Sequence, residues 1–231
     1  MKLASLKLLL ATAGILFGIP AATQTISPPV AEFRGKVNGM YELRNDSDTP
    51  MAVILEIVGF AVNETGVLSY TPLESGVKVD LGAQSFVIPP HRTHMVFYKV
   101  GSEMPNTWFA ILNTLTDASA DRTGIRINFI MPHIVYLYQK RKLDRSDLEV
   151  AVERASEEGK YNVRVVNHSD KLSRVKRLEL RGFDGSPGIP PFPLFPGRAR
   201  IQAFEASAAS PNARAKLFLE DGFTLEVPLA K

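Results

Sequence analysis

The chain has 231 residues, of which 45% are apolar and 22% are charged, and it contains no cysteine. This composition is that of an ordinary globular protein and excludes wholesale disorder. The absence of cysteine excludes disulfide cross-links, so each domain must be stabilised by its hydrophobic core alone. The formal net charge is only +3, and no cluster of basic and aromatic residues of the kind that binds nucleic acid is present.

The first 23 residues are predicted to form a secretory signal peptide. Lys2 and Lys7 lie at the start, and an apolar run at 8–19 is followed by small and polar residues. This run is shorter than the about 20 apolar residues that a membrane span needs. We expect export with cleavage near residues 22–24, and a retained N-terminal anchor is the alternative.

The region after the leader is a series of short runs rich in Val, Ile, Phe and Tyr. Segments rich in Asn, Asp, Gly and Pro separate these runs. Strands are expected at 31–36, 39–44, 51–60, 66–70, 84–88, 94–100, 108–115 and 124–138. Short strands at this spacing, with no helical period between them, predict an all-β fold and a β-sandwich.

A charged segment at 140–147 predicts a boundary between two domains, residues 24–141 and residues 142–231. Strands expected at 148–154, 161–167, 175–182, 198–204, 213–219 and 223–227 predict a second, smaller sandwich. A weak helical pattern at 146–158 is outweighed by its strand-like alternation. No internal repeat of 20 to 50 residues is visible.

A proline-rich segment lies between two of the strands expected in the second domain. Five prolines and three glycines at 185–197 exclude regular structure there. The apolar side chains of this segment, Phe192, Leu194 and Phe195, are expected to pack as a lid over one end of the second sandwich.

Groups that could support catalysis or bind a metal are few. His91 and His94 have an H-x-x-H spacing, but they follow two prolines at a strand entrance, with no further ligand near them in sequence. Glu157 and Glu158 lie beside a glycine without an apolar pocket to shift their pKa. Nucleophile elbow, phosphate loop and dinucleotide motifs are absent. We predict no catalytic site, no metal site, no cofactor and no small-molecule substrate.

The longest expected strand lies in the segment GIRINFIMPHIVYLYQK at 124–140. Ile125, Ile127 and Phe129 alternate with polar residues, and a nearly unbroken apolar run follows. A strand of this kind with a free edge is prone to aggregation. Two interpretations are open: a core strand of its own sandwich, or a strand whose apolar side chains are donated to a partner.

Several segments follow one another in a characteristic order. They are YELRNDSDTPMAVILEI, SFVIPPHRTHMVFYKVG, NTWFAILNTL, the long strand itself and PPFPLFPGRARI. Their order resembles that of the PapD-like periplasmic chaperones of the chaperone/usher pathway, and the resemblance covers nearly the whole chain after the leader. It implies two immunoglobulin-like β-sandwich domains in tandem.

The resemblance also implies a mechanism, donor-strand complementation. Pilus subunits of this pathway lack their last strand, and the chaperone inserts its own strand into the open groove. Ile125, Ile127, Phe129 and Met131 would then point to one side and fill successive pockets. The implied partners are pilus or fimbrial subunits and an outer-membrane usher. The implied protein is a periplasmic, non-enzymatic monomer or weakly self-capping dimer. A structural or adhesive surface-fibre protein is the alternative.

The sequence departs from the family pattern at one place. Family members carry an Arg in the first strand and a Lys in the last, which hold the subunit's terminal carboxylate between the domains. By position the Arg falls near Pro29, and Arg34 lies too far along. The Lys falls near 132–134, where His133 is the only basic candidate and therefore the possible cleft residue. Pro132 has no N–H and is expected to end the donated segment. These departures indicate either a divergent member or a relative that no longer serves pilus assembly.

Overall fold

The computed structural model describes residues 24–35, 37–119, 128–185 and 188–230, so the predicted signal peptide, Ile125 and Ile127 lie outside it. The first ten strands are β1 Thr25–Ser27, β2 Val30–Arg34, β3 Val37–Arg44, β4 Met51–Val62, β5 Leu68–Thr71, β6 Val77–Leu81, β7 Ser85–Ile88, β8 Thr93–Ser102, β9 Thr107–Asp117 and β10 Asn128–Tyr138. The remaining strands are β11 Leu148–Arg154, β12 Lys160–Asn167, β13 Ser173–Asp184, β14 Phe192–Leu194, β15 Ala199–Glu205, β16 Ala208–Leu219 and β17 Thr224–Pro228. The one helical element within these ranges is a 3-10 turn at Arg145–Asp147. In the part of the chain that is described, no helix is long and apolar enough to cross a membrane.

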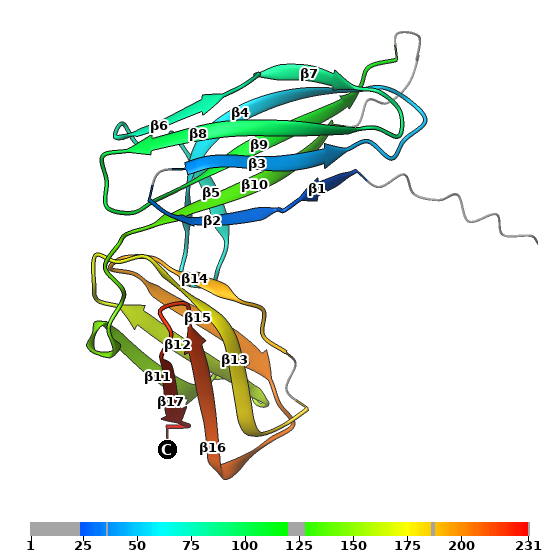
Figure 1. The fold of residues 1–231 in the computed structure, drawn as a ribbon. Helices are drawn as coiled ribbons and strands as arrows, with labels where there is room; N and C mark the ends of the chain where they lie inside the picture. Colours follow the sequence, from blue (N-terminus) through cyan, green and yellow to red (C-terminus); the bar gives the residue numbers. More distant parts are fainter. Residues whose placement is uncertain (1–23, 36, 120–127, 186–187, 231) are drawn as a thin grey trace, which may run out of the picture.

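The strands form two β-sandwiches that follow one another along the chain (Figure 1). In the first, a sheet in the order β1-β3-β8-β6 packs on a sheet in the order β2-β10-β9-β4-β5, and β7 pairs with β4 as well. In the second, the orders are β11-β12-β15 and β14-β13-β16-β17. The predicted all-β fold of two tandem sandwiches is confirmed. The first sandwich ends at Tyr138 and the second begins at Leu148, on either side of the charged segment.

Alternation of side chains along the strands builds each core. In β3 every second residue is buried, so Tyr41 and Leu43 point inward while Met40 and Glu42 face solvent. The second core contains three aromatic rings, Tyr161, Phe183 and Phe204, in mutual contact. A third apolar cluster lies between the sandwiches and contains residues of both.

The proline-rich segment differs from its prediction. Phe192 and Leu194 belong to the core of the second sandwich, within the short strand β14. Phe195 instead packs between the sandwiches, with its ring 6.2 Å from that of Phe60 and 4.9 Å from that of Trp108. The expected lid therefore covers its own core with two residues and contacts the first sandwich with the third.

A buried asparagine closes the turn after β3. The Asn45 side-chain amide donates to the carbonyl oxygens of Thr49 (2.8 Å), Ile88 and Pro89 (3.1 Å each). Its side-chain oxygen accepts from both the backbone N–H and the hydroxyl of Ser47. Asn45 has no exposed surface, so these bonds replace every contact with water that its side chain loses.

The second sandwich repeats this arrangement. The Asn167 side chain donates to the carbonyl oxygens of Lys171 (2.6 Å) and Leu194 (3.3 Å) and accepts from the backbone and hydroxyl of Ser169. In each case a proline-containing segment supplies the distant carbonyl. The two sandwiches are thus related by a local motif that sequence inspection did not reveal as a repeat.

The neighbouring turns also correspond. Arg92 donates its backbone N–H to Pro89, and Arg198 donates to Phe195, each at 3.3 Å. The third residue of the second turn is Gly197, with φ of 62°, whereas the first turn has His91 with φ of 55°. Only glycine adopts this left-handed conformation without a steric penalty, so His91 is strained.

We predict that His91→Gly stabilises the first sandwich by about 1 kcal/mol, because the left-handed penalty is removed. The lost ion pair with Asp48 is solvent-exposed, so its loss should cost little. Urea unfolding measures the change. Gly197→Ala is the reverse comparison and should destabilise the second sandwich. A His91→Gly protein less stable than the parent would show that the pairing with Asp48 outweighs the strain.

Candidate functional site

Strand β10 has one side that is only partly paired. On one side it pairs with β9 from Asn128, opposite Thr116, to Leu137, opposite Thr107. On its other side β2 pairs in parallel only from Ile134 onward. The chain before β2 crosses to the other sheet, where β1 pairs with β3. Among the described residues, the stretch from Asn128 to Pro132 therefore has no strand partner on this side, and we refer to it as the open edge.

The direction of the backbone groups on the open edge follows from the pairing with β2. Ile134 donates its N–H to the carbonyl oxygen of Pro29, on the β2 side of β10, at 2.9 Å. Backbone groups alternate in direction along a strand, so the even-numbered residues of β10 direct their N–H and C=O groups to this same side. Asn128 and Ile130 thus present N–H and C=O groups to a further strand. Pro132 has the same parity, and its missing N–H faces the open edge rather than β9. This explains why β10 continues through Pro132, opposite Leu112, without a break.

The two predicted donor residues that the structure describes, Phe129 and Met131, differ in their exposure to solvent. Phe129 and Met131 lie on the core-facing side of β10, as their parity requires. Met131 is half-buried against the first core, whereas Phe129 is not part of that core and is 47% exposed. Ile125 and Ile127 lie outside the described residues. Ile130, on the opposite face, is 59% exposed and was not among the predicted site residues, although an isoleucine on an expected solvent face was a usable signal.

His133 lies inside the first sandwich and has no exposed surface. Its Nδ1 is 2.9 Å from the carbonyl oxygen of Pro28, which can only accept, so Nδ1 carries the proton. Its Nε2 then accepts from the Tyr98 hydroxyl at 3.0 Å, and the ring stacks on Tyr41 at 4.2 Å. Burial lowers the pKa of His133 to about 4, so the ring is neutral at pH 7. This placement argues against His133 as a cleft residue that grips an anion.

The positions expected for the family's Arg and Lys therefore carry no side-chain cation. The carbonyl oxygens of Pro28 and Pro29 bond to His133 and Ile134 instead. Arg34 lies at the far end of β2, where its guanidinium pairs with the buried Asp221 of the second sandwich at 3.3 Å and donates to the carbonyl oxygen of Gln139. Arg34 thus joins the two sandwiches.

A second polar group between the sandwiches centres on Glu32. Its carboxylate accepts from Arg174 and from the Tyr138 hydroxyl, each at 2.7 Å. Burial, reinforced by the Glu32 carboxylate, raises the pKa of Tyr138. The positive charge of Arg174 is thus paired with this carboxylate.

Each of the other three histidines contacts a neighbouring side chain. His91 pairs with Asp48 at 2.9 Å, His94 stacks on Phe86 at 3.8 Å, and His168 contacts Glu149 at 3.1 Å. No group of three or more His, Asp or Glu side chains suited to a metal occurs in the ranges that the structure describes.

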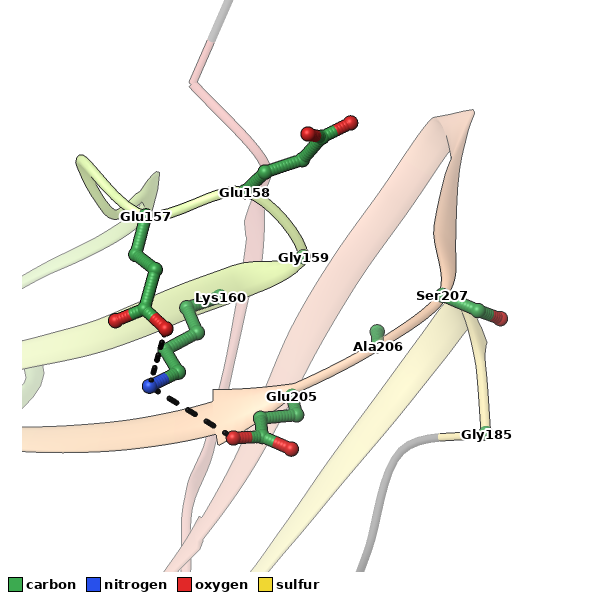
Figure 2. Close-up of a pocket in the computed structure, with 8 residues that line it drawn as sticks. All are labelled: Glu157, Glu158, Gly159, Lys160, Gly185, Glu205, Ala206 and Ser207. Carbon is green, nitrogen blue, oxygen red and sulfur yellow. Dashed lines mark ion pairs between the residues drawn. The ribbon is translucent and has the colours of Figure 1, made fainter.

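A shallow pocket lies at the end of the second sandwich (Figure 2). Glu157 and Glu205 direct their carboxylates at Lys160, at 2.8 and 3.9 Å, while Glu158 and Ser207 point away from it. The carboxylates closest to Lys160 are thus paired with it, and the described residues that line the pocket include no nucleophile and base in contact.

Comparison with known proteins assigns the fold. No family model and no curated protein matches the sequence. Solved structures do match, and several of them are described as chaperones or as complexes of chaperones with pilus subunits. The protein therefore has the tandem immunoglobulin-like fold of these chaperones, and the predicted PapD-like resemblance is confirmed at the level of the fold.

Three of these structures show the extent of the similarity. CsuC, in the CsuC–CsuE chaperone-tip adhesion subunit pre-assembly complex from archaic chaperone-usher Csu pili of Acinetobacter baumannii, has a TM-score of 0.56 at 13% identity. The aligned region covers 91% of this chain and 100% of the CsuC chain. SafB, in complex with the SafA pilin of Salmonella enterica, has a TM-score of 0.54 at 9% identity over 90% and 97% of the two chains. The CupB2 chaperone of Pseudomonas aeruginosa has a TM-score of 0.53 at 13% identity over 89% and 100%.

Proposed function

We propose that the protein is a periplasmic chaperone that stabilises pilus or fimbrial subunits by donor-strand complementation and delivers them to an outer-membrane usher. The observation that carries the proposal is the open edge of β10, which presents backbone groups and exposed apolar side chains together. The tandem fold shared with CsuC and SafB, both solved with subunits, supports the same assignment.

Two kinds of interaction would hold the subunit. Asn128 and Ile130 would extend a subunit's sheet by backbone hydrogen bonds, each worth about 0.5 to 1.5 kcal/mol. Phe129, with the preceding Ile125 and Ile127, would enter the subunit's groove, where each buried side chain contributes about 1.5 to 3 kcal/mol. The mechanism needs no cofactor and no catalytic group.

Capture would depend on strand pairing rather than on a carboxylate anchor. The site of the family's Arg and Lys is occupied here by proline carbonyls and a neutral, buried His133. A terminal carboxylate placed there would lose its hydration without gaining a cation, which is unfavourable. Binding should therefore depend little on whether the subunit's C-terminus is free.

The test compares Phe129→Asp with Phe97→Asp. Phe97 is a matched control because it is also exposed, at 57%, but lies on β8 in the opposite sheet. Each protein is co-expressed with a pilus subunit, and the co-purifying subunit is quantified. Phe129→Asp should lower recovery about ten- to a hundredfold, the equivalent of one lost apolar anchor. Phe97→Asp should capture the subunit like the parent.

Circular dichroism must first show that both variants remain folded, as their exposed positions predict. Equal recovery by Phe129→Asp and the parent would rule out donation by this edge. The alternative function, a structural or adhesive fibre protein, requires the purified chain to polymerise without a partner. The three chaperone structures named above do not favour that alternative.

A further inference from the structure

The β4–β5 hairpin extends from the first sandwich to the second (Figure 1). At its tip, the carbonyl oxygen of Glu64 accepts the backbone N–H of Ile201, in β15, at 2.7 Å. Arg200 directs its guanidinium to the same oxygen at 3.4 Å. β15 is the edge strand of its sheet, so the bond from Ile201 uses a group that faces away from that sheet.

The hairpin is stiffened internally. The Asn63 side-chain oxygen accepts the Val67 N–H at 2.8 Å and the Thr65 hydroxyl at 3.0 Å, and its backbone carbonyl accepts from Gly66. A Cβ at Gly66 would lie 2.0 Å from the Arg200 guanidinium, so the tip fits closely against the second sandwich.

The Arg200 side chain has few polar partners other than the hairpin tip. Its Nε is buried and has no hydrogen-bond partner within the described residues, and no carboxylate pairs with it there. Its charge faces the Glu64 carbonyl and, at 5.8 Å, the ring of Phe192. A guanidinium held in this way loses hydration, which the hairpin offsets only in part.

The tip is distant in the chain from the attachment between the sandwiches at the linker. At the linker, the Gln139 side chain both donates to and accepts from the Leu172 backbone, each at 3.0 Å. The apolar cluster containing Phe60 and Phe195 contributes residues from both sandwiches. Contacts near the linker, including the pair of Arg34 with Asp221, leave the sandwiches attached there, and a further contact at the hairpin tip restricts rotation about that attachment.

We propose that the β4–β5 hairpin is an interdomain strut, which fixes the angle between the two sandwiches through the contact of Glu64 with Ile201 and Arg200. The strut presents the open edge of β10 and the second sandwich in one constant geometry. The inference does not depend on the proposed function, because it concerns the protein without a partner.

The test replaces Ile201 by proline. Ile201→Pro removes the N–H and places a ring carbon between this nitrogen and the Glu64 oxygen, which it would push away, while an edge strand tolerates a proline whose nitrogen faces outward. Ala203→Pro is the matched control, since Ala203 lies two residues along β15 with the same backbone direction and is exposed. The full chain has no cysteine, so spin labels can be attached at Lys99→Cys and Glu153→Cys, one exposed site on each sandwich.

Pulsed electron paramagnetic resonance then gives the distribution of distances between the two spin labels. The parent and Ala203→Pro should give one narrow distribution, whereas Ile201→Pro should shift it or about double its width. Circular dichroism confirms that the variants are folded. An Ile201→Pro distribution that superimposes on the parent's, or a parent distribution that is already broad, would overturn the proposal.

Discussion

Replacing Asn45 by alanine is expected to destabilise the first sandwich by about 3 to 5 kcal/mol, since each buried polar group left unpaired costs about 1 to 3 kcal/mol. The substitution removes the Asn45 donor from the carbonyl oxygens of Ile88 and Thr49, of which Thr49 keeps the Ser47 hydroxyl, and it leaves the Ser47 N–H without its acceptor. A loss of this size approaches the whole stability of many domains.

Urea unfolding followed by the fluorescence of Trp108 measures the loss, because the only tryptophan of the chain lies in the first sandwich. Asn38→Ala is the matched control, since Asn38 is an exposed asparagine of β3, and it should change the free energy of unfolding by less than about 0.5 kcal/mol. Asn167→Ala should have a comparable effect on the second sandwich. A change below about 1 kcal/mol for Asn45→Ala would show that water replaces the lost bonds.

Acidification from pH 7 to pH 5 is expected to destabilise the first sandwich by about 2 kcal/mol through His133 alone. Its pKa is about 4 in the folded state and 6.5 when unfolded, so between these values the unfolded chain binds more protons. The contribution of the neutral His133 to the free energy of unfolding is therefore fully present above pH 6.5, and it decreases as the pH falls toward 4. Below pH 4 this group causes no further loss.

The pH window separates His133 from the carboxyl groups. Asp147 and Glu226 have lowered pKa values, so their contributions are lost at more acidic pH. His133→Gln should remove most of the dependence between pH 7 and pH 5, even if the variant is less stable throughout. A smaller part should persist through His94, whose pKa is also lowered by burial. An unchanged pH profile in His133→Gln would exclude a neutral, buried His133 as its source.

The sequence was sufficient to predict the fold class because strand alternation is local. The inward and outward residues of β3 and β12 can be assigned without knowing their neighbours in space. The short strands β1, β6 and β14 were not predicted. In β6, Lys78 and Asp80 interrupt a run of only five residues, so the local signal is weak.

The open edge could be predicted as a strand but not as an edge. Whether β10 has a free side depends on where β2 begins to pair with it, and that depends on the crossing of the chain between sheets near Pro28. The burial of His133 has the same origin, since the carbonyl that fixes its ring is 105 residues away in sequence. The strut was not predicted because a backbone bond such as that between Glu64 and Ile201 leaves no trace in side-chain pattern.

The proline in the middle of β10 also bears on solubility. Because Pro132 offers no N–H to the uncovered side, a strand that adds there from another molecule cannot extend its hydrogen bonds toward Ile134, where β2 already occupies the position. Growth of such an intermolecular sheet is thus blocked at one end. An apolar strand with a free edge favours the growth of fibrils, and Pro132 in this way limits the intermolecular pairing that β10 can support.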